Sequence, residues 1–168
     1  MVSYYKAGKN FLKLSCDNDK LTGISFCQDP AAKSTDESKT INIGISSSAL
    51  DLTKKWLDIY FSGNIPGFLP PISLNGTDFQ MRVWSKLLKI PYGKTVTYGE
   101  LAKEIANEMG KAKMSAQAVG NAVGKNPIAI IIPCHRVIGA DGSLTGFAGG
   151  LETKKELLML EKQKQNNP

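Results

Sequence analysis

In the first 75 residues the hydrophobic positions first form short apolar runs and then recur at the spacing of a helix. The runs are bounded by polar turns and rich in aromatic and apolar residues, which predicts a meander of three strands. They lie at residues 2–6, 11–16 and 21–27. A helix follows, with Ser47 or Ser48 as its cap. Its apolar residues recur at helical spacing: Ala49, Leu52, Trp56, Leu57 and Tyr60. The polar run 29–39 between strands and helix predicts a surface loop.

Beyond a proline-rich stretch the pattern becomes mainly helical. Capping-box patterns, with Gln or Glu three residues after Thr, open helices at Thr77 and Thr97, and Ser115 can cap a third helix. The second and third helices are short and closely linked, which indicates a helix-turn-helix. We therefore expect an α/β fold of the α+β type. It has a small N-terminal strand-meander-plus-helix domain, residues 1–75, and a mainly helical C-terminal domain, residues 76–168.

The third helix of this series, residues 116–123, has an unusually small surface. Ala116, Ala118, Gly120 and Ala122 recur along it. Small residues let two helices pack closely, and they equally let a helix approach the floor of a narrow groove. The residues alone leave both readings open.

An apolar run of isoleucines at 130–132 predicts a buried strand. Pro133 ends it directly before Cys134, which is followed by His135, the only histidine of the chain. A thiol attacks as its thiolate and needs a base or a cation nearby, and His135 and Arg136 can supply both. A free cysteine is also often a plain buried residue, so this pair alone does not establish chemistry.

The end of the chain combines a turn at 139–142, a glycine-rich loop at 146–150 and a closing helix from 151 to about 164. The glycines of the loop allow a close approach of backbone to a ligand. The expected buried positions of the closing helix are Leu151, Leu157, Leu158 and Leu160.

The net charge of +6 is concentrated in the second half of the chain. Residues 1–75 carry 8 Lys and Arg against 7 Asp and Glu, whereas residues 76–168 carry 13 against 8. The stretch between Glu108 and Asp141 contains no acidic residue. It does contain Lys111, Lys113, Lys125 and Arg136. This basic stretch suits a polyanionic partner such as DNA.

The three cysteines have no C-x-x-C spacing, and with one histidine they indicate neither a disulfide framework nor a metal site. We expect Cys16 and Cys27 to be buried thiols in a reducing cytoplasm. The sequence shows no export signal and no apolar stretch long enough to span a membrane. We therefore expect a cytoplasmic protein with no membrane association, no metal and no cofactor.

The segment Pro133–Val137, Pro-Cys-His-Arg-Val, resembles the active-site signature of the O6-alkylguanine-DNA alkyltransferases, or methylated-DNA–protein-cysteine methyltransferases. Further blocks that resemble the family follow its order, at 97–102, 118–122, 124–127 and 146–151. The resemblance covers about residues 76–161, and the first half is similar only in length and coarse pattern.

The resemblance implies DNA repair by direct, irreversible transfer of an alkyl group from O6-alkylguanine to a cysteine, with O4-alkylthymine as a second candidate substrate. The enzyme would act once, as a monomer and without a cofactor. It would bind double-stranded DNA through the minor groove and flip the damaged nucleotide out.

The resemblance also implies roles for individual residues. Cys134 would be the nucleophile, with His135 as its base through a water molecule. Glu161 would orient His135, and Asn126 would tie the helix-turn-helix to the active-site strand. These four form the expected catalytic group.

Contacts with DNA and the flipped base are implied for a second set of residues. Tyr98 would contact the base, the carbonyls of Cys134 and Val137 would accept from the guanine amino group, and the Ala148 amide would donate to O6. The full set is Tyr98, Gln117, Ala118, Gly120, Lys125, Arg136, Val137 and Ala148. Arg136 has a structural interpretation as well.

Three features depart from the family pattern. Gln117 stands where an arginine usually fills the gap left by the flipped base. Phe147 and Ala148 replace the tyrosine and serine that are common in some members. The link between the two short helices is a few residues longer than usual. These departures bear on lesion affinity and on the range of alkyl groups accepted.

Two other functions fit parts of the pattern. A non-catalytic alkyltransferase-like protein would bind damaged DNA, but such relatives lack the acceptor cysteine that is present here as Cys134. A cysteine hydrolase would need turnover and normally an oxyanion hole.

Overall fold

The structure, a computed structural model, describes residues 1–30 and 47–163 and divides into two compact units. The first unit comprises Met1–Leu74 together with Pro127–Ala129. The second comprises Asn75–Asn126 and the chain from Ile130 onward. Each unit mixes strands with helices, so the α+β class is confirmed. The predicted loop 29–39 lies outside the described residues from Ala31 on.

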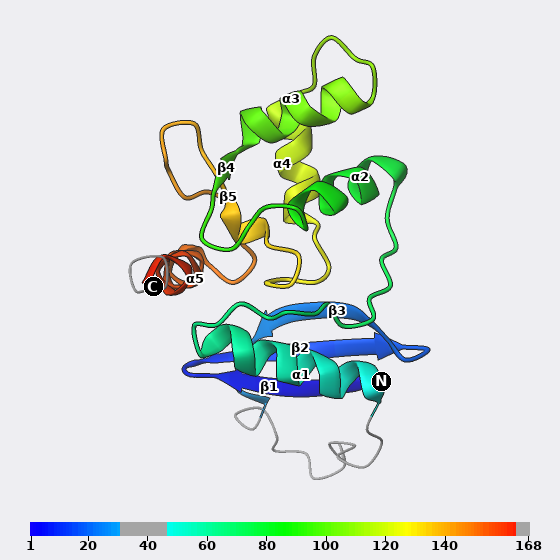
Figure 1. Cartoon of the computed structure of the whole chain (residues 1–168), viewed down its shortest axis with the longest axis vertical. Helices are drawn as coiled ribbons and strands as arrows, with labels where there is room; N and C mark the ends of the chain where they lie inside the picture. The colour runs from blue at the N-terminus through cyan, green and yellow to red at the C-terminus, as the bar shows by residue number, and fades with distance from the viewer. Residues whose placement is uncertain (31–46, 164–168) are drawn as a thin grey trace. The chain divides into compact units, whose positions relative to one another are not determined.

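Within its described residues, the first unit is an antiparallel sheet with one α-helix, as its sequence pattern predicts. The strands β1 (Val2–Ala7), β2 (Asn10–Asp17) and β3 (Lys20–Cys27) pair in the order β1-β2-β3. Figure 1 shows helix α1 (Ser48–Phe61) lying along one face of this sheet. Ser47 caps the helix by accepting a hydrogen bond from Leu50 N at 3.2 Å.

The buried side of α1 differs slightly from the prediction. Leu52 is only half-buried, whereas Leu50 and Thr53 face the core. Thr53 is tolerated there because its hydroxyl donates to Ala49 O at 2.7 Å. The sheet provides buried apolar side chains at alternate positions of β2, namely Leu12, Leu14 and Cys16, and at Leu21 and Ile24 of β3.

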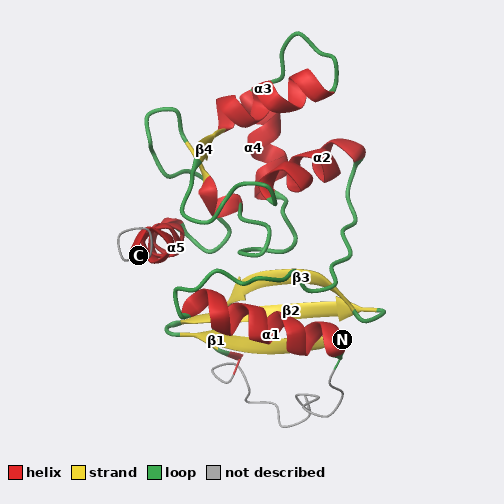
Figure 2. Cartoon of the chain, viewed as in Figure 1, coloured by secondary structure: helices red, strands yellow, loops and turns green. Residues whose placement is uncertain are grey.

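The described part of the second unit contains four α-helices, a two-stranded parallel sheet and one turn of 3₁₀ helix (Figure 2). In chain order these are α2 (Asp78–Leu87), β4 (Val96–Thr97), α3 (Tyr98–Glu108), α4 (Ala116–Gly124), η2 (Cys134–Arg136), β5 (Val137–Ile138) and α5 (Leu151–Gln163). The predicted caps are present: Thr77 and Thr97 form capping boxes, and Ser115 accepts from Ala118 N at 3.3 Å.

Helices α3 and α4 pack against each other and form the predicted helix-turn-helix. Their facing sides are apolar and buried: Leu101, Ala102, Ile105 and Ala106 on α3, and Val119, Ala122 and Val123 on α4. Trp84 of α2 joins them by donating from Nε1 to Ala122 O at 2.9 Å. The series of small residues on α4 is therefore divided, because Ala122 faces the core while Ala116 is exposed.

The isoleucine run is buried as predicted, but it is not a strand. Ile130 and Ile132 are fully buried, yet Ile130 adopts a left-handed φ of 72° at a turn. Just before it, Pro127–Ala129 bonds to β3 around Ile24 through two backbone hydrogen bonds, Ile24 N to Pro127 O and Ala129 N to Ile24 O. Apolar content predicted the burial, whereas these separate backbone partners decided the conformation.

The closing helix α5 buries a different side from the one that the leucines predict. Leu151 is 50% exposed, and Leu158 and Leu160 are only half-buried. The buried positions are Thr153, Lys154, Leu157 and Glu161. Charged groups inside a protein need partners, so these positions mark a polar site rather than a plain core.

Candidate active site

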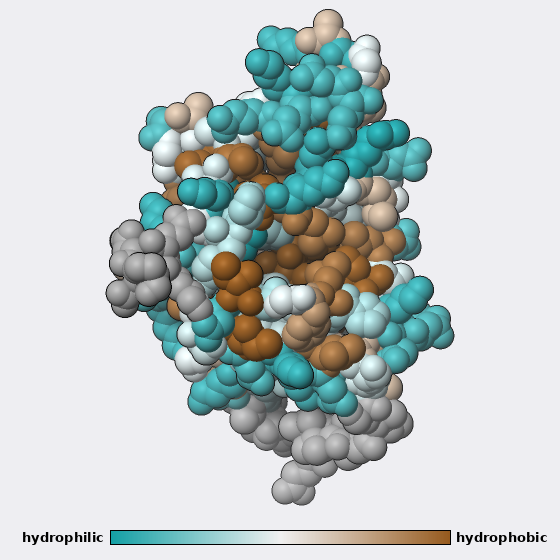
Figure 3. Space-filling model, viewed as in Figure 1, coloured by the Kyte–Doolittle hydropathy of each residue, from teal (hydrophilic) through white to brown (hydrophobic). Residues whose placement is uncertain are grey.

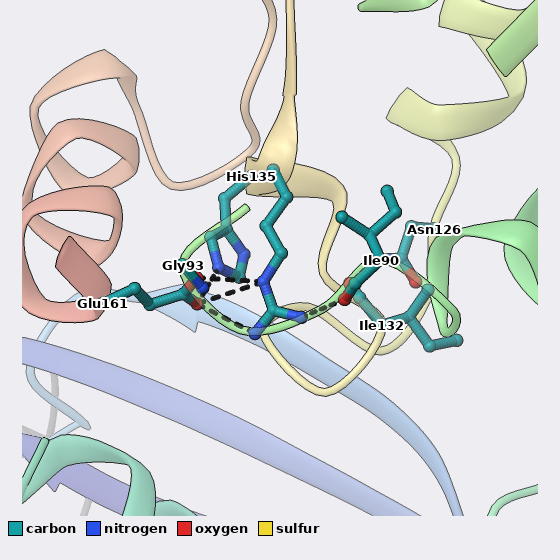
Figure 4. A network of polar contacts seen from close by, with 7 residues as sticks. Ile90, Gly93, Asn126, Ile132, His135 and Glu161 are labelled. Atoms are coloured by element: carbon teal, nitrogen blue, oxygen red, sulfur yellow. Dashed lines mark hydrogen bonds and ion pairs between the residues drawn. The ribbon is translucent and has the colours of Figure 1, made fainter. Parts of the chain in front are cut away.

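Cys134 begins the 3₁₀ turn η2, directly before strand β5. Its backbone N–H donates to Ile132 O at 2.8 Å, and the Asn126 side chain donates to the same carbonyl at 2.7 Å. Asn126 follows the end of α4, so its amide links the helix-turn-helix to the segment that carries Cys134 (Figure 4). This is the tie that the resemblance implies for Asn126.

His135 and Glu161 lie side by side although 26 residues separate them in sequence. His135 Nε2 and Glu161 Oε1 are 2.7 Å apart, and both side chains are fully buried (Figure 4). An ionised carboxylate only accepts hydrogen bonds, so the imidazole proton sits on Nε2. That tautomer leaves Nδ1 as the basic nitrogen of the ring.

The protonation state of His135 suits a base. Burial lowers the pKa of His135, and this outweighs the neighbouring Glu161 carboxylate, which raises it. His135 is therefore a neutral imidazole near pH 7. A neutral ring with Nδ1 free of its own proton can accept the proton of a thiol.

Glu161 is held by further donors besides His135. Arg136 donates from Nε and Nη2 to the carboxylate at 3.0–3.2 Å, and Gly93 N donates at 2.9 Å. Burial alone would raise the pKa of Glu161, but the hydrogen bonds and charges of His135 and Arg136 lower it to about 2. The carboxylate therefore stays ionised, and the Arg136 guanidinium balances its charge.

Arg136 is part of this buried network and does not act as a surface cation. It is only 8% exposed, and Nη1 donates to Ile90 O at 2.6 Å. Its guanidinium also lies 5.6 Å from the centre of the Tyr92 ring. The assignment of Arg136 as a DNA contact is thus corrected, and its structural interpretation stands. A guanidinium with this many fixed partners is not available to a phosphate.

The Cys134 thiol is protonated at rest. Burial raises its pKa, and a hydrogen bond with Asn126 and the charge of Lys154 lower it only partly. A thiol in this state does not attack until a base takes its proton. The neighbouring neutral His135 is the group that can take it.

Lys154 of α5 is fully buried, which the sequence analysis did not anticipate. Its Nζ donates to Val137 O at 2.7 Å and to Thr145 O at 2.9 Å. A signal was present in the sequence: Lys154, Leu157 and Glu161 recur at i, i+3 and i+7, which places them on one side of a helix. We overlooked it because a lysine is normally exposed.

A groove of about 590 Å³ lies between α4, Tyr98 and the loop after β5. Its lining residues are Tyr98, Ala116, Gln117, Gly120, Asn121, Gly124, Thr145, Gly146 and Ala148. Four predicted contacts, Tyr98, Gln117, Gly120 and Ala148, are thus brought together from three segments. A side chain at Gly120 would begin 3.6 Å from the Tyr98 ring, so α4 passes close to Tyr98.

The other predicted contacts lie elsewhere. Val137 is buried beside Cys134, Ala118 is half-buried, and Lys125 is exposed just past the end of α4. Asn121 lines the groove one helical turn after Gln117, and sequence reasoning missed it as a separate contact. Its spacing of four residues from Gln117 is the signal that could have found it.

The loop between α3 and α4 extends the basic surface. Lys111 and Lys113 are both exposed there. Figure 3 shows hydrophilic surface over α3 and the loop that follows it. These ammonium groups are therefore available to an anionic partner.

Two features are absent from residues 1–30 and 47–163. No group of three or more His, Cys, Asp or Glu side chains in these ranges is arranged to hold a metal ion. None of the helices there is long and apolar enough to cross a bilayer.

Comparisons with known proteins agree with this geometry. The model of the family described as 6-O-methylguanine DNA methyltransferase, DNA binding domain, matches residues 78–163. A relative from Mycobacterium tuberculosis (strain ATCC 25618 / H37Rv), named methylated-DNA–protein-cysteine methyltransferase, is 52% identical over 121 residues, which cover 72% of this chain and 68% of the relative.

Solved structures are similar over nearly the whole chain. Mycobacterium tuberculosis OGT in complex with DNA has a TM-score of 0.75 at 40% identity, covering 96% of this chain and 92% of its own. The O6-methylguanine DNA methyltransferase from Methanococcus jannaschii has a TM-score of 0.70 at 26% identity, covering 95% and 93%. The likeness thus includes the first unit, where the sequence pattern alone was weak.

Proposed function

Since this chain belongs to the methylated-DNA–protein-cysteine methyltransferase family, we propose that it moves the alkyl group of O6-alkylguanine in DNA onto Cys134. DNA repair by alkyl transfer is the activity that the family membership supports, and DNA is the partner. The observation that carries the choice of residues is the buried His135–Glu161 pair beside Cys134. It supports a base of fixed orientation next to a thiol that needs one.

The proposed reaction is a single displacement. The Cys134 thiol gives its proton to Nδ1 of His135, through a water molecule as in the family. The thiolate then attacks the alkyl carbon, a carbon–sulfur bond forms, and the bond to O6 breaks. The electron pair of that bond stays on the guanine, which is reprotonated. The thioether at Cys134 has no leaving group, so each molecule acts once.

Access to O6 requires that the damaged nucleotide leave the stack. Flipping costs a few kcal/mol, and a lesion with weakened pairing lowers that cost. The absence of a side chain at Gly120 supports docking of α4 in the minor groove of DNA. Gln117 would fill the space that the flipped base leaves in the stack, and Tyr98 would contact that base. We propose that one monomer does this. We also propose a cytoplasmic location, because thiols stay reduced in that compartment.

The alternative of a non-catalytic damage-binding protein is not favoured. Relatives of that kind lack the acceptor cysteine, and Cys134 is present with a base beside it. A direct test is to incubate the protein with duplex DNA containing O6-methylguanine and weigh the intact protein. We expect a gain of one methyl group per molecule. Tight binding without any gain would support the damage-binding function instead.

Phosphate contacts should make DNA affinity depend on salt. If Lys111, Lys113 and Lys125 contact phosphates, log affinity should fall linearly with log salt. A few contacts predict a slope of about −2 to −4, at roughly −0.9 per phosphate. Fluorescence anisotropy with a labelled duplex at several salt concentrations measures the slope. Replacing the three lysines by methionine should flatten it, while Lys55→Met, an exposed lysine of α1, should leave it unchanged.

Gln117 should hold the flipped state less well than the usual arginine would. A glutamine fills space and offers hydrogen bonds, but it lacks the planar cation that stacks on bases. Gln117→Arg should therefore tighten duplex binding and steepen the salt slope by about one phosphate equivalent. Gln117→Ala should slow transfer from duplex DNA while barely affecting the reaction with free O6-benzylguanine, which needs no flipping.

The matched control for Gln117 is Asn107→Ala, which changes an exposed side chain of α3 outside the groove. It should alter neither reaction. Equal losses with duplex and free base in Gln117→Ala would show that Gln117 supports the pocket itself, and its role in filling the gap would be rejected.

A further inference from the structure

Asn121 is the second polar side chain on the exposed face of α4. It follows Gln117 by four residues, so both side chains project from the same face of the helix, about one turn apart. The other residues of α4 that line the groove are Ala116, Gly120 and Gly124, and none of these has a polar side chain. Gln117 and Asn121 are therefore the hydrogen-bonding side chains that α4 presents to this groove.

The backbone of Asn121 is held firmly, whereas its amide is available. The carbonyl of Ala122, the next residue, accepts a hydrogen bond from Trp84 Nε1 at 2.9 Å, which anchors this turn of α4 to α2. The Asn121 side chain is exposed, and within the described part of the chain it makes no hydrogen bond or ion pair. A polar group carried by a rigid element is well placed to recognise a ligand in one orientation.

An amide recognises a different part of DNA from the part that a lysine binds. A cation binds the phosphates of any sequence, whereas an amide carries both a donor and an acceptor that match the edges of bases. In the minor groove every base pair shows acceptors, and guanine alone adds a donor, its 2-amino group. An asparagine can therefore make two hydrogen bonds with a guanine but only one with an adenine or a thymine.

Resting on the function and the minor-groove docking proposed above, we propose that Asn121 gives the repair reaction a sequence preference by contacting a guanine near the lesion. The amide NH₂ donates to N3 of that guanine, and the amide oxygen accepts from its 2-amino group. Four residues of helix rise by about 6 Å, and stacked base pairs lie about 3.4 Å apart. With Gln117 in the space left by the flipped base, Asn121 reaches a base pair within about two steps of the lesion.

The test compares duplexes that differ by a single amino group. Guanines within two positions of O6-methylguanine, in either strand, are replaced one at a time by inosine, which pairs with cytosine but lacks the 2-amino group. Single-turnover rates are measured with protein in excess but below saturation, so that they report binding and transfer together. At one of these positions the parent should react roughly tenfold more slowly with inosine, the order expected for one two-bond contact to a base.

Asn121→Ala should react at equal rates with the guanine and inosine duplexes. Inosine also pairs more weakly than guanine, but both proteins meet the same duplexes, so the difference between them isolates the contact with Asn121. Asn121 is exposed and alanine favours a helix more than asparagine does, so the variant should fold as the parent does. Thermal unfolding followed by circular dichroism checks this.

Two further variants are controls. Asn107→Ala removes the same kind of side chain from an exposed position of α3 outside the groove, and it should keep the full inosine effect. Gln117→Ala should also keep the inosine effect, although it slows transfer from every duplex, because Gln117 fills the space of the flipped base and does not contact the neighbouring guanine.

Two results would overturn the inference. One is an inosine effect that is absent from the parent or equally large in Asn121→Ala. The other is an equal loss in Asn121→Ala on every duplex, with or without a guanine near the lesion, which would make Asn121 a contact to the sugar or phosphate. Either result, with normal methyl transfer by the parent protein, would reject the role of Asn121 alone. A parent protein that gains no methyl group would reject the proposed function instead.

Discussion

Cys134→Ala is expected to abolish alkyl transfer while the variant still binds duplex DNA with the affinity of the parent. The groove residues and exposed lysines proposed to contact DNA are all untouched by this change. The lost atom is the nucleophile itself, and an alanine has no lone pair to attack the alkyl carbon. Intact mass after incubation with O6-methylguanine duplex, and anisotropy with the same duplex, measure the two properties separately.

The remaining cysteines provide the controls. Cys16 is buried in the first unit with its sulfur 3.3 Å from Ser47 Oγ, and burial raises the pKa of Cys27. Neither of them is next to a histidine, since the only histidine is His135. Cys16→Ala and Cys27→Ala should therefore transfer as the parent does. An alkyl group found by peptide mapping on either of these two sulfurs would refute the choice of Cys134.

The second large effect is expected for Glu161→Gln, which should both destabilise the protein and slow transfer. Removing the charge leaves the Arg136 guanidinium buried without its counter-charge, and breaking a buried pair in this way costs about 3–5 kcal/mol. Urea unfolding followed by circular dichroism measures this loss. Glu152→Gln, an exposed acid in the first turn of the same helix, is the control and should change stability very little.

The effect of Glu161→Gln on transfer follows from its contact with His135. A glutamine that turns its amide nitrogen toward Nε2 presents a donor, which removes the preference for the tautomer with a basic Nδ1. Positioned acid–base groups contribute about 10²–10⁴-fold to a rate, so we expect transfer to slow by about 100-fold or more. Single-turnover kinetics with free O6-benzylguanine, under conditions where the variant is folded, measures this. An unchanged rate would show that His135 needs no orientation by Glu161.

Lowering the pH should remove the contribution of the Glu161 carboxylate to the free energy of unfolding. The folded pKa of Glu161 is about 2, below the unfolded value of about 4.3, so its contribution to stability is fully present above about pH 5. That contribution is lost as pH falls toward 2. The free energy of unfolding of the parent should thus drop toward that of Glu161→Gln between pH 5 and pH 2. A gap between the two proteins that stays constant over this range would contradict an ionised, paired Glu161.

Local features of this protein were determined by the sequence alone. The caps at Thr77, Thr97 and Ser115 each join a side chain to a backbone N–H three residues away. Such contacts depend only on neighbouring residues, so they form wherever the local pattern occurs. The three strands of the meander and the five α-helices of the described residues follow for the same reason. The Cys134–His135 pair was equally readable, because the two residues are adjacent in the sequence.

Contacts between distant segments were decided only by the tertiary structure. The spacing of Lys154, Leu157 and Glu161 places them on one side of α5, but no local pattern shows that the two charged side chains on that side are buried. Lys154 and Glu161 form a buried site because α5 packs its polar side against η2 and β5. There His135 and Arg136 contact Glu161, and the Val137 carbonyl accepts a hydrogen bond from Lys154. The conformation of the isoleucine run at 130–132 was likewise decided by contacts with other segments. Hydrophobicity predicted that Ile130 is buried, but hydrogen bonds from Ile24 and Asn126 to the residues around it made a turn where a strand was expected.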